Sequence, residues 1–439
     1  MNSEAIPVTP AIDSPAIDSL VISELADFEL RLYHGALLAG RLLAGFAPRL
    51  GDIPPRAALV SAVNSLIGQA ELLHTRIGEL RVPREKMGRP SVAAVEQAAE
   101  LARADDPQRA LAWGQALLRG LARLHASARD NCTAETTYHD RRLHERCRVL
   151  AEDGLTRFAE LGLPAADLGD YLSAPHQAGA SVTPTGTVEL PLVACPARAY
   201  PSWAPRVPAI GGQMPDPDPS KLDDETVVYL LRKGVQIEFI ATDVPLRSMA
   251  DFADLPLGFY TDMNRHAHDE MRHTHLLFSE LAAMGVDYKQ FPYRDPDLYA
   301  AMAGQPLDHR MIVLSRTGED AAIEVFGNAV PKLRAAGYES VAIMFDHVLA
   351  DELRHVTYAN RWLGHLYDGD DLAVEAATER CLIRHNEIVD EVGLGDYAKR
   401  EPDHMAFRGR GRPNLELRAM AGFSERDLQR LSAASGGAR

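Results

Sequence analysis

The chain has 439 residues, of which 46% are hydrophobic and 25% are charged, a composition typical of folded globular domains. It has 62 acidic residues against 46 basic ones, and the resulting net charge of -16 argues against binding to nucleic acid. No apolar run approaches the ~20 residues of a membrane-spanning helix, the first residues carry no secretory signal, and the four cysteines lack CxxC spacing. We therefore expect a cytoplasmic protein of roughly two domains that does not bind membranes.

Residues 1–20 are polar and interrupted by proline, so we expect a mobile leader there. From residue 21 to residue 163, apolar residues recur at spacings of three and four. Breakers such as Pro83 and Asn131 separate four helical stretches within this segment. The segment 21–163 is therefore predicted to be an N-terminal helical bundle.

Ten of the 28 prolines fall between Pro175 and Pro219. A helix does not survive that density of proline, so residues 164–221 are predicted to form a Pro/Gly-rich connector at a domain boundary. A second helical bundle is expected over 222–395, followed by a tail over 396–439. The helices expected in the second bundle cover 222–252, 259–285, 306–336, 338–367 and 372–392.

Two helices of the second bundle contain nearly the same pentapeptide. The pentapeptides are Asp269-Glu270-Met271-Arg272-His273 and Asp351-Glu352-Leu353-Arg354-His355. A Glu and a His three residues apart lie on one face of a helix, so both can face one metal ion. Each pentapeptide also follows a glutamate whose immediate neighbours are mostly apolar: Glu238 precedes Glu270 by 32 residues, and Glu324 precedes Glu352 by 28.

The positions of these residues predict a site for two metal ions. Counted from turns near Leu255 and Gly337, each antiparallel pair of helices places its glutamates within about one helical turn of the same level. Four carboxylates and two imidazoles suit two ions of iron or manganese better than zinc or copper. The predicted ligands are Glu238, Glu270, His273, Glu324, Glu352 and His355.

Four further residues are expected to support the ligands. Asp269 and Asp351 can turn toward the neighbouring helix and accept the N–H of a ligand imidazole, which fixes the tautomer of that ring. Arg272 and Arg354 can pair with these carboxylates.

Residues 222–430 resemble a family of uncharacterised bacterial ferritin-like proteins, a domain of unknown function. The resemblance rests on EFIATD, on DEMRH and DELRH, and on a closing stretch that contains Arg412-Pro413-Asn414 and Arg418-Ala419-Met420-Ala421-Gly422-Phe423. More distantly, the site is similar to those of di-iron oxygenases and of ribonucleotide reductase small subunits. The resemblance implies a ferritin-like four-helix bundle with a dimetal centre, and it implies no substrate.

The ligand set and the resemblance together lead us to expect an all-α oxidoreductase. Two iron ions, or a manganese–iron or dimanganese pair, would activate O2 to hydroxylate or N-oxygenate a small organic substrate, with electrons from an unidentified donor. One alternative is a ferroxidase or metal-handling protein without an organic substrate, and another is a non-enzymatic, metal-stabilised binding module. Whether the chain forms a homodimer is left open.

Weaker candidates lie outside the predicted ligand set. His266, one turn before Glu270, would be either a third imidazole ligand or a half-exposed histidine on a His-rich helix. In the N-terminal bundle, Glu29, Glu71 and His74 resemble part of such a site. Their unequal distances from the intervening turn favour a structural bundle over a second metal or ligand site.

Overall fold

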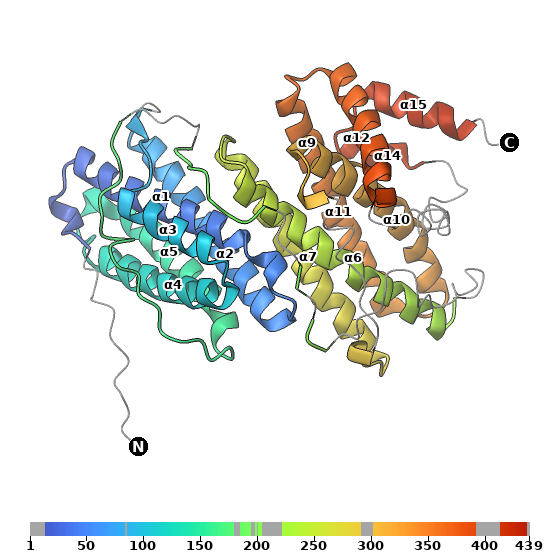
Figure 1. Ribbon diagram of the computed structural model, residues 1–439, viewed down its shortest axis with the longest axis horizontal. Helices are drawn as coiled ribbons and strands as arrows, with labels where there is room; N and C mark the ends of the chain where they lie inside the picture. Colours follow the sequence, from blue (N-terminus) through green and yellow to red (C-terminus); the bar gives the residue numbers. More distant parts are fainter. Residues whose placement is uncertain are drawn as a thin grey trace. The chain divides into compact units, whose positions relative to one another are not determined.

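The computed structural model describes residues 14–83, 86–179, 185–194, 198–199, 201–203, 222–290, 302–391 and 413–436. Within these ranges the regular structure is helical and contains no β-strand, which confirms the all-helical fold class (Figure 1). None of the described helices has the length and apolar character needed to cross a bilayer. The expected leader, connector and tail fall partly outside the described residues.

The chain divides into two compact units, which we describe separately. Unit 1 comprises Met1–Pro201 and Leu246–His268, and unit 2 comprises Ser202–Pro245 and Asp269–Arg439. Helices α6 (Asp224–Asp251) and α7 (Leu257–Ala283) therefore contribute residues to both units. This division differs from the expected bundles in the segment 246–268, which belongs with the N-terminal helices.

Helices α1 to α5 form the main part of unit 1, and α1 packs against α2 while α5 packs against α2 and α4. Side chains that accept backbone N–H groups define two helix starts: Ser91 caps α3 and Asp106 caps α4. Helix α3 adds to the four helical stretches expected here. The helices are α1 (Ile22–Ala44), α2 (Ile53–Glu79), α3 (Val92–Ala104), α4 (Pro107–Asp130) and α5 (Tyr138–Leu155).

A buried arginine explains why segment 246–268 belongs to unit 1. Arg41 of α1 is inaccessible to solvent and donates hydrogen bonds to the carbonyl oxygens of Val188 (2.7 Å), Met249 (2.9 Å) and Ala250 (3.1 Å). Its guanidinium group also lies over the ring of Tyr260, 5.4 Å from the ring centre. These contacts tie α1 to the end of α6 and the start of α7.

The helices expected over 222–392 match the structure closely except in one region, and two further helices form within the expected tail. The sequence predicts a continuous regular helix over 306–336, whereas the structure has a short helix, a nine-residue π-helix and an α-helix there. π-Helices are rare and occur frequently at functional sites. The elements are α9 (Leu307–Arg310), the π-helix η7 (Met311–Glu319), α10 (Asp320–Ala335), α11 (Glu339–Leu366), α12 (Asp371–Glu391), α14 (Leu415–Met420) and α15 (Glu425–Gly436).

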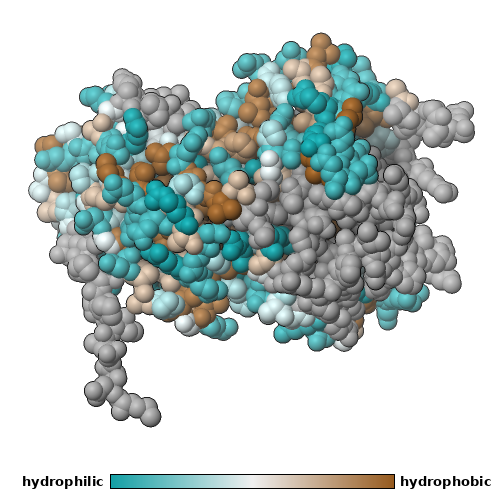
Figure 2. All heavy atoms as spheres, in the orientation of Figure 1, coloured by the Kyte–Doolittle hydropathy of each residue, from teal (hydrophilic) through white to brown (hydrophobic). Residues whose placement is uncertain are grey.

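Helix α11 is the centre of unit 2, because it packs against α10, η7 and α14. On the face drawn in Figure 2, hydrophobic residues are interspersed with hydrophilic ones. Scattered apolar side chains of this kind are normal on a protein surface. The unusual feature of the described residues is instead a cluster of buried charged residues on α6, α7, η7 and α11.

Candidate metal centre

Helices α7 and α11 each bury a glutamate and a histidine on one face. In α7, the Nδ1 atom of His273 lies 3.4 Å from a carboxylate oxygen of Glu270, and in α11 the Nδ1 atom of His355 lies 3.5 Å from Glu352. All four residues are at most 3% exposed. The i, i+3 spacing therefore directs the ligand atoms of each pair to the same place.

The two pairs also approach each other. The Nδ1 atom of His355 lies 2.9 Å from Glu270, and that of His273 lies 3.8 Å from Glu352. Glu238 of α6 adds an oxygen 3.6 Å from the Nδ1 atom of His273. Three helices thus direct carboxylates and imidazoles toward one buried region.

The ligand atoms form two groups of four, and within each group the atoms lie within 4.8 Å of one another. Either group could hold a metal ion. Glu270 belongs to both groups and is therefore the residue best placed to bridge two ions. The first group is Glu238, Glu270, His273 and Glu352, and the second is His266, Glu270, Glu319 and His355.

The structure brings five of the six predicted ligands into these groups and places Glu324 elsewhere. Glu324 accepts a hydrogen bond of 2.6 Å from Arg418, and Glu319, at the end of η7, stands in the cluster instead. The reason is local: η7 ends at Glu319, and residues five apart in a following regular helix lie about 140° apart around its axis. His266, which is 1% exposed, is buried rather than half-exposed.

Glu319 was missed although the sequence carries a signal for it. Glu319 precedes Glu352 by 33 residues, close to the 32 residues between Glu238 and Glu270, whereas Glu324 precedes Glu352 by only 28. The apolar neighbours of Glu324 favour it as a buried ligand, whereas Glu319 lies in the polar stretch SRTGED. Equal spacing in the two halves of the bundle was the better guide.

The cluster carries more negative charge than its surroundings can offset. Burial and the neighbouring Glu270 raise the pKa of Glu238 well above its ordinary value, and the same two causes raise that of Glu352 to about 7. Burial alone would lower the pKa of His273, but Glu270 and Glu238 raise it to about 10. Buried carboxylates at this density stay ionised only beside cations, and two divalent ions would balance the four glutamates.

Two aspartates support the histidines from the opposite helix. Asp351 of α11 accepts a hydrogen bond from Nε2 of His273 in α7 (3.1 Å) and pairs with Arg272. Reciprocally, Asp269 of α7 lies 3.6 Å from Nε2 of His355 in α11. Each aspartate lies beside the Nε2 atom of the opposite histidine, so the Nδ1 atom of each ring faces the cluster, where it could bind a metal ion in place of a proton.

A family comparison covers the part of the chain that contains this cluster. The model of a family described as "Protein of unknown function (DUF455)" matches residues 196–429, more than half of the chain. The chain belongs to the DUF455 family. The matched region includes every glutamate and histidine of the two groups, as well as Arg418. Comparisons with curated proteins and with solved structures found no match.

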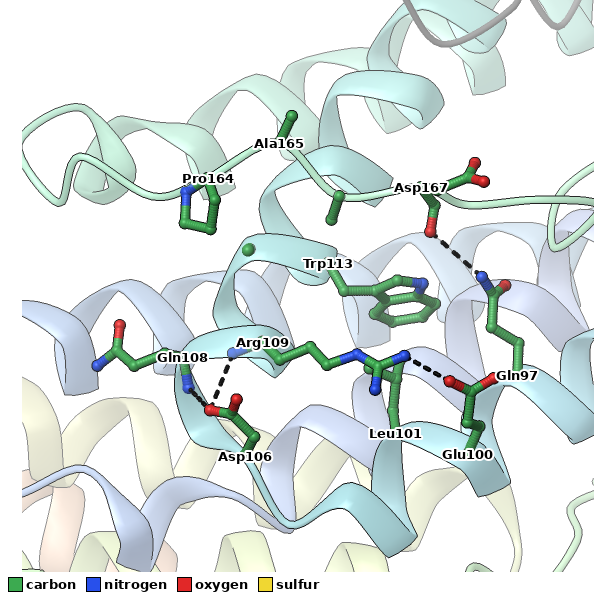
Figure 3. Close-up of a pocket in the computed structure, with 12 residues that line it drawn as sticks. Gln97, Glu100, Leu101, Asp106, Gln108, Arg109, Trp113, Pro164, Ala165 and Asp167 are labelled. Carbon is green, nitrogen blue, oxygen red and sulfur yellow. Dashed lines mark hydrogen bonds and ion pairs between the residues drawn. The ribbon is translucent and has the colours of Figure 1, made fainter. Parts of the chain in front are cut away.

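A pocket of about 460 Å³ lies in unit 1, outside the DUF455 region, between α3, α4 and residues 164–167 (Figure 3). Its charged side chains already have structural partners. Arg109 pairs with Glu100, and Asp106 accepts the first N–H groups of α4. The lining residues therefore offer no acid–base pair or ligand set comparable to the cluster in unit 2.

Of the N-terminal candidates Glu29, Glu71 and His74, only Glu29 joins a buried row of polar groups, and this row is not a convergent site. Glu71 is exposed, whereas Glu29 is inaccessible and lies 3.3 Å from Nε2 of His144. The Nδ1 atom of His144 in turn lies 3.0 Å from Nδ1 of His125. Because His144 uses one ring nitrogen toward each neighbour, the three groups lie in line and do not surround a point where an ion could bind.

This row should make the stability of unit 1 depend on pH. Burial, and then the nearby His144, hold the pKa of His125 well below its ordinary value. When the pH falls below about 6.5, the unfolded chain binds a proton at His125 that the folded protein excludes, so the free energy of unfolding falls by up to ~1.4 kcal/mol per pH unit.

Urea denaturation at pH ~7.5 and ~5.5 measures this dependence. His125→Gln should reduce the difference in unfolding free energy between the two pH values. Equal pH dependence in the variant and the natural protein would show that His125 titrates normally in the folded state.

Proposed function

We propose that the DUF455 region is a ferritin-like dimetal oxidoreductase that uses O2 to hydroxylate or N-oxygenate a small organic substrate. The observation that carries the proposal is Glu270, whose carboxylate belongs to both groups of potential ligands. Around it, α6 and η7 each supply one glutamate, and α7 and α11 each supply Glu-x-x-His. This is the ligand pattern of dimetal carboxylate proteins with a ferritin-like bundle.

The donor atoms favour iron or manganese. Carboxylate oxygens with a minority of imidazole nitrogens suit these metals, whereas zinc and copper sites are richer in nitrogen or sulfur. Two bound iron ions would supply the electrons that reduce O2. Inserting one oxygen atom into a C–H or N–H bond and reducing the other to water takes two external electrons and two protons, so a donor would restore the two electrons that the ions give up in each turnover.

The protein positions the ligands and excludes water from the site. Glu270 would contribute its carboxylate to both ions, Asp269 and Asp351 lie against the imidazoles, and Arg272 offsets the charge of Asp351. The ligands are at most 6% exposed, so the surrounding helices keep bulk water away from the oxidising centre.

The same burial favours an oxygenase over a ferroxidase. A ferroxidase releases the iron that it oxidises, so its ligands must exchange ions repeatedly. Here the imidazoles are fixed by aspartates from the facing helix, which suits ions that stay bound. A ferroxidase is therefore the second candidate.

Anaerobic reconstitution with ferrous iron followed by exposure to air distinguishes the two. We expect about two iron ions per chain to bind, to be oxidised and to remain bound when a large excess of ferrous iron is added. Repeated oxidation of the excess with accumulation of mineral would favour the ferroxidase. A single zinc ion per chain would contradict the dimetal proposal. A screen of metabolites for a mass gain of one oxygen atom can then search for the substrate.

The aspartate opposite His273 should matter for reactivity more than for metal content. Asp351→Asn preserves side-chain volume but removes the charge that stabilises the ring of His273. We expect the variant to bind iron but to consume O2 ~10–100-fold more slowly after reduction. Asp346→Asn, on the exposed face of the same helix, serves as the control and should react like the natural protein. Unchanged O2 consumption in Asp351→Asn would argue against this role.

A further inference from the structure

The helix that runs from η7 into α10 carries two glutamates that could serve the metal centre. Glu319 closes η7 and stands in the second group of ligands, whereas Glu324 lies one turn and a half further on. Residues five apart lie about 140° apart around a regular helix, so only one of them can face the ions. A residue that fixes the rotation of this helix therefore decides which glutamate becomes a ligand.

Arg418 of α14 binds two side chains of this helix. It is 4% exposed, and it contacts both Asp320 and Glu324. Its Nε and Nη2 atoms lie 2.8 and 2.9 Å from the two carboxylate oxygens of Asp320, and its Nη1 atom donates to Glu324 at 2.6 Å. Asp320 directly follows Glu319, so the two-point contact of a planar guanidinium restricts the rotation of the helix next to the ligand.

The segment around Arg418 is itself firmly held. We call residues 413–427 the C-terminal clasp. Asn414 caps α14 by accepting the N–H of Leu417, and the inaccessible Ala421 packs with Ile323 and Val356. The carbonyl oxygen of Ala421 accepts a hydrogen bond of 2.8 Å from Asn360 of α11.

The clasp also contacts η7 directly. Arg316 of η7 pairs with Asp427 at 2.8 Å, and its guanidinium group lies 4.7 Å from the ring centre of Phe423. The clasp therefore holds the π-helix on one side of Glu319 through Arg316 and the α-helix on the other side through Arg418.

We propose that Arg418 is a positioning residue of the metal centre, which holds Glu324 away from the ions and so makes Glu319 the ligand from this helix. The inference rests on the proposed dimetal function and goes beyond it. Without Arg418, the carboxylates of Asp320 and Glu324 lose their shared cation and repel each other at i, i+4 spacing. The π-turns can then rearrange toward a regular helix, and Glu324 gains access to the ions.

The test uses the full chain, reconstituted anaerobically with ferrous iron, and measures iron per chain and the rate of its release to a chelator. In the natural background, Glu319→Gln should lose iron while Glu324→Gln keeps it. Arg418→Met should release iron about tenfold faster or more, the range typical of lost support around metal ligands. In the Arg418→Met background, the additional substitution Glu324→Gln should lower the iron content further, because Glu324 has become a ligand.

In this outcome, iron binding comes to depend on Glu324 when Arg418 is replaced. A purely structural role for Arg418 would not produce this result. If Glu324→Gln has no effect in either background, the inference is wrong, whatever happens to stability. If the natural protein binds no pair of iron ions, or Glu270→Gln leaves them bound, the proposed function fails and this inference fails with it.

Two further variants complete the test. Arg418→Lys retains a positive charge without the planar two-point contact, and it should release iron at a rate between those of the natural protein and Arg418→Met. If Arg418→Met does not fold, Arg418→Lys alone tests the inference. Iron release from Arg418→Lys at the rate of the natural protein would overturn it. Arg430→Met removes an exposed ion pair with Glu375 from the same C-terminal segment and should leave iron release unchanged.

Discussion

Replacing Glu270 by glutamine should remove both metal ions from the protein. Glu270 is the one residue shared by the two groups of ligand atoms, and its carboxylate is 1% exposed. An amide offers one neutral oxygen in place of two charged ones, so it cannot bridge two cations. We expect bound iron, measured by elemental analysis of the purified protein, to fall from about two ions per chain to nearly none.

Glu280→Gln is the matched control for this variant. Glu280 lies in the same helix, α7, seven residues beyond His273, where it accepts a hydrogen bond from Ser340 and belongs to neither group of ligands. The control should retain its iron. Full retention of two ions by Glu270→Gln would remove the basis for a bridging role.

Arg41→Met should strongly destabilise unit 1. Arg41 is inaccessible and satisfies the carbonyl oxygens of Val188, Met249 and Ala250. Methionine fills a similar volume but leaves these acceptors buried without donors, and each such loss costs roughly 1–3 kcal/mol. We expect the free energy of unfolding to fall by at least ~3 kcal/mol in urea denaturation.

Arg123→Met is the control, because Arg123 is exposed on α4 of the same unit. Its effect should stay within ~0.5 kcal/mol, as is usual for surface substitutions. A similarly small effect of Arg41→Met would contradict the view that Arg41 ties segment 246–268 to the N-terminal helices.

Much of the fold could be predicted because the spacing of apolar residues along the chain indicates each helix. The expected range 338–367, for example, corresponds to α11 at Glu339–Leu366. The sequence did not reveal that α6 and α7 divide between the two units. That division depends on contacts such as Arg41 with Met249, which lie about 200 residues apart in sequence and leave no local pattern.

The sequence predicts the parts of the candidate site that depend on residue spacing in a regular α-helix. It does not predict the part that depends on a π-helix. Glu270 and His273 lie together because they are three residues apart in a regular helix. Glu319 is not predicted as a ligand because the sequence pattern indicates a regular helix here, whereas a π-helix precedes α10. The contact of Arg418 with Glu324 joins segments 94 residues apart, so no local pattern indicates it.

Anomalous X-ray diffraction from crystals of the iron-loaded protein, measured on both sides of the iron absorption edge, tests the central claim most directly. The proposal predicts two iron peaks about 3.5–4 Å apart, both in contact with Glu270, with Glu319 rather than Glu324 as the ligand from the η7–α10 helix. A single peak, or no peak among these side chains, would contradict a dimetal centre.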